Sequence, residues 1–320
     1  MTRYILEKVG RAVFVAWAAF TVTFILLFVI PADPVDLLFD PATINTVPPE
    51  VKEQVRDNYG FNQPVLLQYL SRLGHALRGD FGNSVQSGKS VTTSIAEVVP
   101  QTLVLALSAL LLAVVIAFVI AVVATSTRHL WLRGLIEALP TAAVSVPVFL
   151  SGILLLQVFA FRLGWFPAFG DDGWRSLVLP LVSLAIPVSG PIAQLLVRSF
   201  GTELHAGYVT TSRAKGADRA HILSREVFRN AALPALTIAG VTFGNLIAGS
   251  VITETVFART GVGRLTQSAI STLDVPLVQG LVMFVAVSFA VINLVVDLVY
   301  PILDPRLRTA VPTTGRGVTV

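Results

Sequence analysis

"LVLALSALLLAVVIAFVIAVVA", residues 103–124, contains no charged side chain. A hydrocarbon core about 30 Å thick is crossed by about 20 helical residues, so this stretch predicts a transmembrane helix. The whole chain shares the bias, because its 320 residues are 54% hydrophobic and 13% charged, with a mean hydropathy of +0.76. An average soluble domain has about 25% charged residues. The composition therefore predicts an integral membrane protein.

Five further apolar stretches approach the length of a membrane span, which predicts an all-α polytopic fold with six transmembrane helices. The predicted spans are residues 12–30, 103–124, 138–161, 177–197, 232–252 and 277–300. The third and fourth contain "VSVPVFLSG" and "LAIPVSGP". Prolines and glycines persist within a bilayer where neighbouring helices satisfy the freed backbone groups. We therefore expect these two helices to be bent and buried in protein.

Basic residues gather in alternate connections, and this asymmetry orients the predicted helices. They occur before span one, between spans two and three, between spans four and five, and in the C-terminal tail. Lysine and arginine near span ends mark the cytoplasmic side, so we expect both termini in the cytoplasm. The predicted parts are an N-terminal tail and first helix (1–31), an extracellular cap (32–100), a transmembrane domain (101–305) with a cytoplasmic loop (199–231), and a cytoplasmic tail (306–320).

The cap contains one predicted amphipathic helix. Its leucines recur at helical spacing after Gln63, and Gly79 is placed to end the helix. These leucines are Leu66, Leu70, Leu73 and Leu77. We expect the apolar face to pack on the membrane domain. A helix lying on lipid is the less favoured alternative, because little lysine or arginine flanks its polar side.

The cap also contains "GNSVQSGKS", residues 82–90, which is similar to a phosphate-binding loop. A Walker A loop needs four residues between its first glycine and the Gly-Lys-Ser/Thr. That spacing puts the first glycine at position 83, where Asn83 stands. The segment also lies on the predicted outer face, where ATP is not supplied. We therefore expect a polar turn with Lys89 as a solvated charge, and no nucleotide binding.

Titratable residues avoid the middle of every predicted span, where proton relays and buried catalytic groups of membrane proteins occur. Glu254 lies just past the fifth span and Asp297 near the cytoplasmic end of the last, so we expect both at an interface or against a partner. The chain has no cysteine, which excludes disulfides and thiol chemistry. We expect no catalytic residue, no metal and no cofactor. The net charge of +4 is small, and no nucleic-acid partner is implied.

The deep polar residues are uncharged, and two interpretations of them stay open. They either line a passage or join helices by hydrogen bonds, which is the commoner role. These residues are Gln157, Gln194, Asn245 and Asn293, of which Gln194, Asn245 and Asn293 are the candidates for a translocation pathway. Nearby, Gly240, Gly244 and Ala248 recur at four-residue spacing, which predicts close helix approach.

The cytoplasmic loop contains "HAGYVTTSRAKGADRAHILSREVFRNAALP", residues 205–234. It predicts two short helices divided at Gly216, where a left-handed backbone costs least, with Asp218 capping the second. The exposed cations Arg213, Lys215 and Arg219 suit either anionic lipid headgroups or a partner protein. The residues alone leave both open.

Motifs along nearly the whole chain resemble the inner-membrane permease subunits of ABC importers, specifically the dipeptide and oligopeptide type. In the loop these are "YVTTSRAKGA" followed by "RNAALP". Elsewhere they are "FVIPADPV", "GDFGNS", "VPQTLVLAL", "SVPVFLSG", "LGWFPAFG", "ITETVFARTGVGRL", "VPLVQG" and "NLVVDLVYPILDPRLR". The loop departs from the general permease pattern in having Thr210 where an acid usually stands, Thr211 and Ser212 as the small pair, and a longer gap to Leu233 and Pro234.

The resemblance implies a catalytically silent permease subunit of an ATP-driven peptide importer in the bacterial cytoplasmic membrane, forming half of the translocation passage. The implied partners are a second homologous permease, two ABC ATPases that hydrolyse ATP, an extracellular solute-binding protein, the peptide and membrane lipid. It assigns ATPase coupling to Tyr208, Thr211, Ser212, Arg213, Ala214, Lys215, Gly216 and Ala217. A transporter driven by an ion gradient is the alternative, and it needs intramembrane ionisable residues or an unwound ion site.

Overall fold

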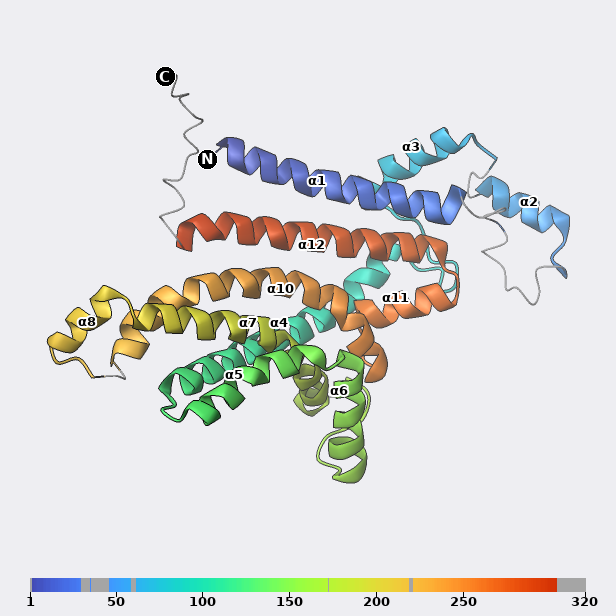
Figure 1. The fold of residues 1–320 in the computed structure, drawn as a ribbon. Helices are drawn as coiled ribbons and strands as arrows, with labels where there is room; N and C mark the ends of the chain where they lie inside the picture. Colours follow the sequence, from blue (N-terminus) through green and yellow to red (C-terminus); the bar gives the residue numbers. More distant parts are fainter. Residues whose placement is uncertain are drawn as a thin grey trace, which may run out of the picture.

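The protein is a bundle of long helices (Figure 1). The computed structural model describes residues 2–29, 35, 46–58, 62–171, 173–218 and 221–303. Arg219, the tail at 306–320, most of residues 30–45 and the Asp297 side chain lie outside the described residues. Among the residues described, one isolated β-bridge joins Asn83 and Ser90. The expected all-α class is confirmed.

In the part of the chain that the structure describes, four helices are long and apolar enough to cross a membrane, or up to six spans if each of two bent helix pairs is one span. The four are α1 (Thr2–Phe24, continued by a π-helical turn at Ile25–Val29), α4 (Val91–Ser126), α7 (Gly173–Leu204) and α12 (Val275–Leu303). The first bent pair is α5 (Leu130–Ser145) with α6 (Val148–Leu155) and the π-helical turn Leu156–Arg162. The second is the π-helical turn Ile222–Val227 with α10 (Phe228–Val256).

The third span is bent, as the sequence predicted, but the expectation that it is buried in protein is wrong within this chain, because Leu135, Val144 and Leu154 are exposed. Its two halves meet at 98°, and the break falls at Val146 and Pro147. Proline disfavours the helical conformation of the residue before it, and Val146 is extended, with φ −85° and ψ 118°. The fifth span is also bent, by 60°, and Pro234 lies between its halves. The bend in the fifth span was not predicted.

The fourth span is one continuous helix, α7, of 32 residues that contains three prolines, and more than half of its apolar stretch is buried in the protein, as expected. A proline leaves the carbonyl four residues earlier without its helical donor. For Pro180 that carbonyl is on Ser176, and Arg259 Nη1 donates to it at 3.2 Å. For Pro187 it is on Ser183, and Ser151 Oγ donates to it at 3.3 Å. Neighbouring side chains thus replace the missing donors.

Helix α4 packs most extensively against α7. Its packed face is a stripe of small residues that are fully buried, Ala106, Ala109, Ala113, Ala117, Ala121 and Ala124. The opposite face exposes large apolar side chains, among them Leu107, Leu111 and Val115. Small residues permit close helix approach in a bilayer. The alanine stripe therefore faces protein, and the aliphatic face remains for lipid or a partner helix.

Helices α10 and α12 approach closely at the glycines singled out in the sequence. A Cβ on Gly240 would lie 2.5 Å from Val296 Cγ2, and one on Gly244 would lie 3.0 Å from Phe289 Cδ2. The prediction of close packing is confirmed at both positions. The side chain of Ala248 lies outside the described residues.

The two ends of the bundle differ. The start of α1, the end of α12 and α8 (Gly207–Ala214) lie at one end, whereas α2 (Pro49–Asn58), α3 (Val65–Ala76) and α11 (Val262–Ser271) lie at the other (Figure 1). The sequence predicted this separation of the termini and the basic loop from the cap.

The cap helix α3 packs on the membrane domain, as predicted, but only one leucine of the predicted stripe takes part. Leu73 packs with Tyr69 against the cluster of Phe20, Phe24 and Phe28. Leu66, Leu70 and Leu77 are exposed, so the expectation is wrong for these three. Tyr69 contacts the rings of Phe20 and Phe24 at centroid distances of 5.7 and 5.3 Å. Its hydroxyl also hydrogen-bonds Thr21 at 2.9 Å. An aromatic residue with a polar tip contacts both apolar and polar neighbours. The Tyr69 side of α3 therefore faces α1.

Candidate functional site

The segment predicted to couple the chain to an ATPase is α8 and the turn after it. Helix α8 ends at Ala214 with Lys215 as its C-cap, and Gly216 has φ +84°, a left-handed backbone that glycine adopts readily. Asp218 Oδ1 accepts a hydrogen bond from the His221 N–H at 2.9 Å. Both the bend at Gly216 and the cap at Asp218 are confirmed. The predicted second short helix is not a separate element, because the π-helical turn Ile222–Val227 continues directly into α10.

The predicted coupling residues divide between an outward and an inward face of this segment. Five of the eight are exposed, namely Thr211, Arg213, Ala214, Lys215 and Gly216. The other three, Tyr208, Ser212 and Ala217, are partly buried. The structure therefore presents two cations and small residues outward, which is a surface that another molecule can contact.

The inward face of α8 is hydrogen-bonded to the end of α7 and to the π-helical turn before α10. Ser212 Oγ lies 2.6 and 2.7 Å from the two carboxylate oxygens of Glu226, on the π-helical turn before α10. Tyr208 donates its hydroxyl proton to Glu203, near the end of α7. Burial raises the pKa of the Tyr208 phenol, and the Glu203 hydrogen bond raises this pKa further. The phenol therefore remains a donor at neutral pH, and α8 is tied to α7 and to α10.

Val209 anchors α8 in the core, and the sequence analysis missed it. Its side chain is 1% exposed and belongs to a cluster with Phe200, Val227 and Ala231. The signal was available in the sequence, because Val209 is an isolated aliphatic residue between a tyrosine and two polar threonines. Movement of α8 therefore acts on α7 and α10 through packed side chains as well as hydrogen bonds.

The three candidate pathway residues lie on three different helices, and no hydrogen bond joins any two of them among the residues described. Gln194 on α7 donates to Thr141 Oγ1 on α5 at 3.3 Å and lines a cavity of about 370 Å³ between these helices. Asn293 on α12 donates to the Phe289 carbonyl of its own helix at 2.9 Å. Asn245 on α10 is exposed. Their role in a pathway stays a prediction.

A buried carboxylate near the C-terminal end of α10 is a second site, whose burial the sequence analysis did not predict. Glu254 is 1% exposed, so its expected place at an interface or against a partner is wrong. Thr102 Oγ1 on α4 donates to it at 2.7 Å, and the Gly263 N–H at the start of α11 donates at 2.7 Å. The helix continues to Val256, and α11 then folds back over the carboxylate. Glu254 thus joins α4, α10 and α11.

Two glycines make room for this carboxylate. A Cβ on Gly261 would lie 2.2 Å from Glu254 Cδ, and one on Gly263 would lie 2.2 Å from the Val251 Cα. A side chain at Gly261 would displace the Glu254 carboxylate, and one at Gly263 would collide with the backbone of Val251. The "GVG" after an isolated glutamate was therefore the available signal in the sequence.

The "GNSVQSGKS" segment forms the predicted polar turn, but its surroundings differ from the expectation. Lys89 is exposed and pairs with Glu97 at 3.3 Å. Buried Asp274, before α12, accepts hydrogen bonds from Ser84 Oγ at 2.5 Å and the Val85 N–H at 3.2 Å. The turn is thus docked on α12 through one carboxylate.

We expect Asp274→Ala to loosen this turn and Lys89→Ala to leave it intact. Removing the acceptor leaves the buried Ser84 hydroxyl without its partner, at a cost of about 1–3 kcal/mol. An exposed charge away from such features contributes less than about 0.5 kcal/mol. Thermal unfolding of the purified chain and limited proteolysis of the cap test both variants. Equal behaviour of the two variants contradicts this prediction.

Comparisons with known proteins agree with this architecture. Residues 113–309 match the family described as binding-protein-dependent transport system inner membrane component, and residues 1–106 match its N-terminal membrane component. A putative peptide transport system permease protein of Brucella abortus (strain 2308) is 36% identical over 316 residues, covering 96% of this chain and 99% of the relative. A glutathione transport system permease protein of Escherichia coli (strain K12) is 31% identical over 308 residues, with coverages of 96% and 99%.

A solved structure supports the same fold. The MetNI methionine ABC transporter, in an inward-facing conformation, aligns with a TM-score of 0.55 at 19% identity, over 65% of this chain and 95% of the other. The helical bundle is thus that of an ABC transporter permease. The chain belongs to the family of binding-protein-dependent transport system inner membrane components. It is a multi-pass inner membrane protein and a non-catalytic subunit, and its transport system includes an ATPase and a binding protein.

Proposed function

We propose that this chain is one of two homologous permease subunits of an importer that carries short peptides across the bacterial cytoplasmic membrane. The observation that carries the proposal is similarity along 96% of the chain to permeases whose names specify peptide and glutathione transport. Glutathione is itself a short peptide, so both names specify one class of cargo. Two ATPases supply the energy, and an extracellular binding protein delivers the peptide.

The orientation follows from the positive loops. The basic connections, the start of α1, the end of α12 and α8 belong to one end of the bundle (Figure 1). Positive residues near span ends remain on the cytoplasmic side. Both termini and α8 are therefore in the cytoplasm, and the cap with α2 and α3 is outside, where the binding protein docks.

Coupling takes place through the outward face of α8. The exposed Arg213 and Lys215 enter a groove on the ATPase, and Gly216 sets the direction in which the chain leaves it. The inward face transmits movement, because Ser212 and Val209 bind α8 to the neighbouring long helices. When the ATPases close on ATP, the two coupling helices shift and rotate α7 and α10 at the inner end of the passage.

The test of this function is transport by the reconstituted complex. The chain is purified with its partner permease, ATPases and binding protein, and uptake of radiolabelled trialanine into proteoliposomes is measured. We expect uptake to require ATP and binding protein and to persist after ionophores dissipate ion gradients. Uptake that follows an ion gradient without ATP supports the secondary-transporter alternative, and a system that carries no peptide contradicts the proposal.

The orientation has its own test, because the chain has no cysteine. Single cysteines replace Ser87 in the cap turn and Ala214 on α8, and both positions are exposed. We expect an impermeant thiol reagent to label the Ser87→Cys variant in intact cells and the Ala214→Cys variant only after permeabilisation. The untouched chain is the control. The reverse pattern contradicts the orientation.

A further inference from the structure

Three leucines of the cap helix α3 point away from the rest of the chain. Leu66, Leu70 and Leu77 are 68%, 53% and 81% exposed, and their helical spacing puts them on one side of the helix. In water, an amphipathic helix buries its apolar side and exposes its polar side. This exposed leucine stripe therefore needs an occupant that the described residues do not supply.

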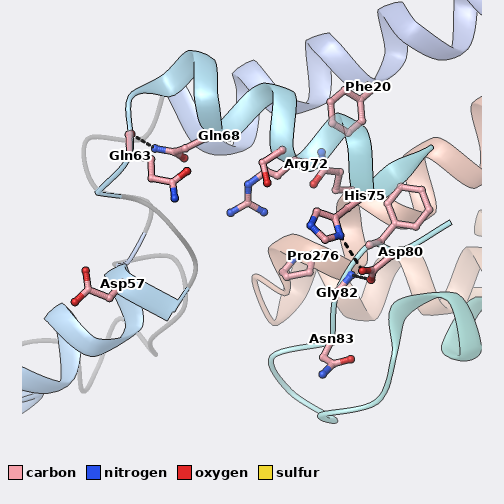
Figure 2. A pocket seen from close by; sticks show the side chains of 13 residues that line it. Phe20, Asp57, Gln63, Gln68, Arg72, His75, Asp80, Gly82, Asn83 and Pro276 are labelled. Carbon is pink, nitrogen blue, oxygen red and sulfur yellow. Dashed lines mark hydrogen bonds and ion pairs between the residues drawn. The ribbon is translucent and has the colours of Figure 1, made fainter. Parts of the chain in front are cut away.

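The polar side of α3 faces into the protein instead. Gln68, Arg72 and His75 line a cavity of about 620 Å³ between α3, α1 and the start of α12 (Figure 2). Gln68 is buried and donates to the Gln63 carbonyl at 2.8 Å. The helix thus has its polar side inward and its apolar side outward. Segments within a bilayer have this arrangement, because their polar residues face the protein interior or a cavity.

Contacts with α1 place α3 at membrane depth. The Tyr69 hydroxyl hydrogen-bonds Thr21 at 2.9 Å, and Thr21 lies within the apolar span Leu6–Val29. Thr21 is eight residues before Val29, which is about 12 Å along a helix. Because half of a hydrocarbon core measures about 15 Å, Tyr69 lies level with the cap-side half of the hydrocarbon.

The neighbouring surface of α1 is apolar and exposed as well. Val22, Ile25 and Leu26 are exposed, and 22% of the apolar span is buried within the chain. Figure 1 shows α3 beside this end of α1. The leucine stripe therefore extends the exposed apolar surface of a membrane span. Arg78, directly after Leu77, is exposed and long enough to keep its charge among lipid headgroups.

We propose that α3 is inserted into the outer leaflet of the bilayer, with Leu66, Leu70 and Leu77 among the lipid acyl chains. A helix of 12 residues is too short to cross the membrane, so it enters one leaflet, as interfacial amphipathic helices do. This insertion fixes the cap on the bilayer. It goes beyond the proposed function, because it does not depend on the cargo, and that function supplies only the orientation that decides the leaflet.

Nitroxide labels measure the insertion, because the chain has no cysteine. Single cysteines replace Leu66, Leu70 and Leu77, and each labelled permease is assembled with cysteine-free partner subunits in nanodiscs of phosphatidylethanolamine and phosphatidylglycerol. Paramagnetic resonance compares collisions with oxygen, which concentrates in hydrocarbon, and with a neutral nickel chelate, which remains in water. We expect oxygen to dominate at all three positions.

Ser71→Cys is the matched control, because Ser71 follows Leu70 in the chain, is exposed and lines the cavity. We expect the nickel chelate to dominate there and at Ser87→Cys on the cap turn. If the chelate also dominates at the leucines, the stripe faces water as a docking site for the binding protein, and the proposal is overturned. Few collisions with either reagent mean that the second permease covers the leucines, which overturns it too.

A charge placed within the stripe tests the insertion in a second way. Leu70→Asp is combined with the label at Leu77, and Ser71→Asp is its control. Because a carboxylate is costly among acyl chains, we expect Leu70→Asp to shift the collisions of the Leu77 label from oxygen toward the chelate and Ser71→Asp to leave them unchanged. No shift in the first variant, or an equal shift in both, overturns the proposal.

Failure of this inference and failure of the proposed function are separate results. The label at Leu70 reports insertion whether or not the complex carries trialanine. Oxygen-dominated leucines without uptake remove the peptide importer and keep the inserted helix, whereas uptake with chelate-dominated leucines does the reverse. The thiol labelling at Ser87 and Ala214 decides the leaflet, and its reversed pattern overturns the choice of the outer one.

Discussion

Glu254→Ala is expected to abolish uptake and to destabilise the cap end of the bundle. The carboxylate accepts hydrogen bonds from Thr102 and from the backbone of Gly263. Alanine leaves these buried donors unsatisfied, at about 1–3 kcal/mol each, and opens a void beside Gly261. Thermal unfolding of the purified chain and uptake by the reconstituted complex measure the two effects.

Two further variants keep this prediction specific. Glu254→Gln retains one acceptor oxygen but turns an amide N–H₂ toward groups that are themselves donors, so we expect an intermediate loss. Glu97→Ala removes an exposed carboxylate of α4 that pairs with exposed Lys89, and we expect uptake near wild type. If Glu254→Ala and Glu97→Ala behave alike, the buried carboxylate does not join the three helices.

Gly216→Val is expected to uncouple ATP hydrolysis from uptake while the chain still inserts and assembles. The backbone at Gly216 has φ +84°, and a Cβ there would meet nothing within 4 Å. The cost is therefore one of backbone conformation alone, about 1–2 kcal/mol for a left-handed non-glycine residue, which is a factor of about 5–30 in the population of the native turn. Transport-coupled ATP hydrolysis and yield of the complex are measured together.

Two controls for Gly216→Val separate the effect of backbone conformation from that of the added side chain. Gly207→Val places the same side chain at the start of α8, where φ is not positive and a Cβ also meets nothing within 4 Å. Gly216→Asn introduces a residue that tolerates the left-handed region. We expect coupling to be retained in both. Full coupling in Gly216→Val, or equal loss in Gly207→Val, argues against a role for this turn.

Elements governed by local chemistry were predictable from the sequence. The apolar runs predicted the long helices, because the cost of unpaired backbone in lipid leaves helix as the structure of an apolar span. Pro147 predicted the break before α6. Gly216 and Asp218 predicted the turn after α8, since a left-handed backbone and a helix cap each depend on one residue type.

Elements governed by distant contacts were not predictable. The continuity of α7 depends on Arg259 and Ser151, which come from other parts of the chain and reach the carbonyls that its prolines free. The packed face of α3 depends on Tyr69 meeting the aromatic rings of α1. The burial of Glu254 depends on α11 folding back toward α4. Hydrophobic periodicity contains none of this information.

The alanine stripe of α4 has a consequence for assembly in the bilayer. Alanine has no side-chain torsion to immobilise, whereas a leucine loses about 0.5–1 kcal/mol of rotamer freedom when it is buried. Lipid tails are as apolar as the helices, so close contact is a main source of attraction between them. Helices α4 and α7 therefore associate without an entropic penalty from the alanines, which favours their pairing as soon as both are inserted.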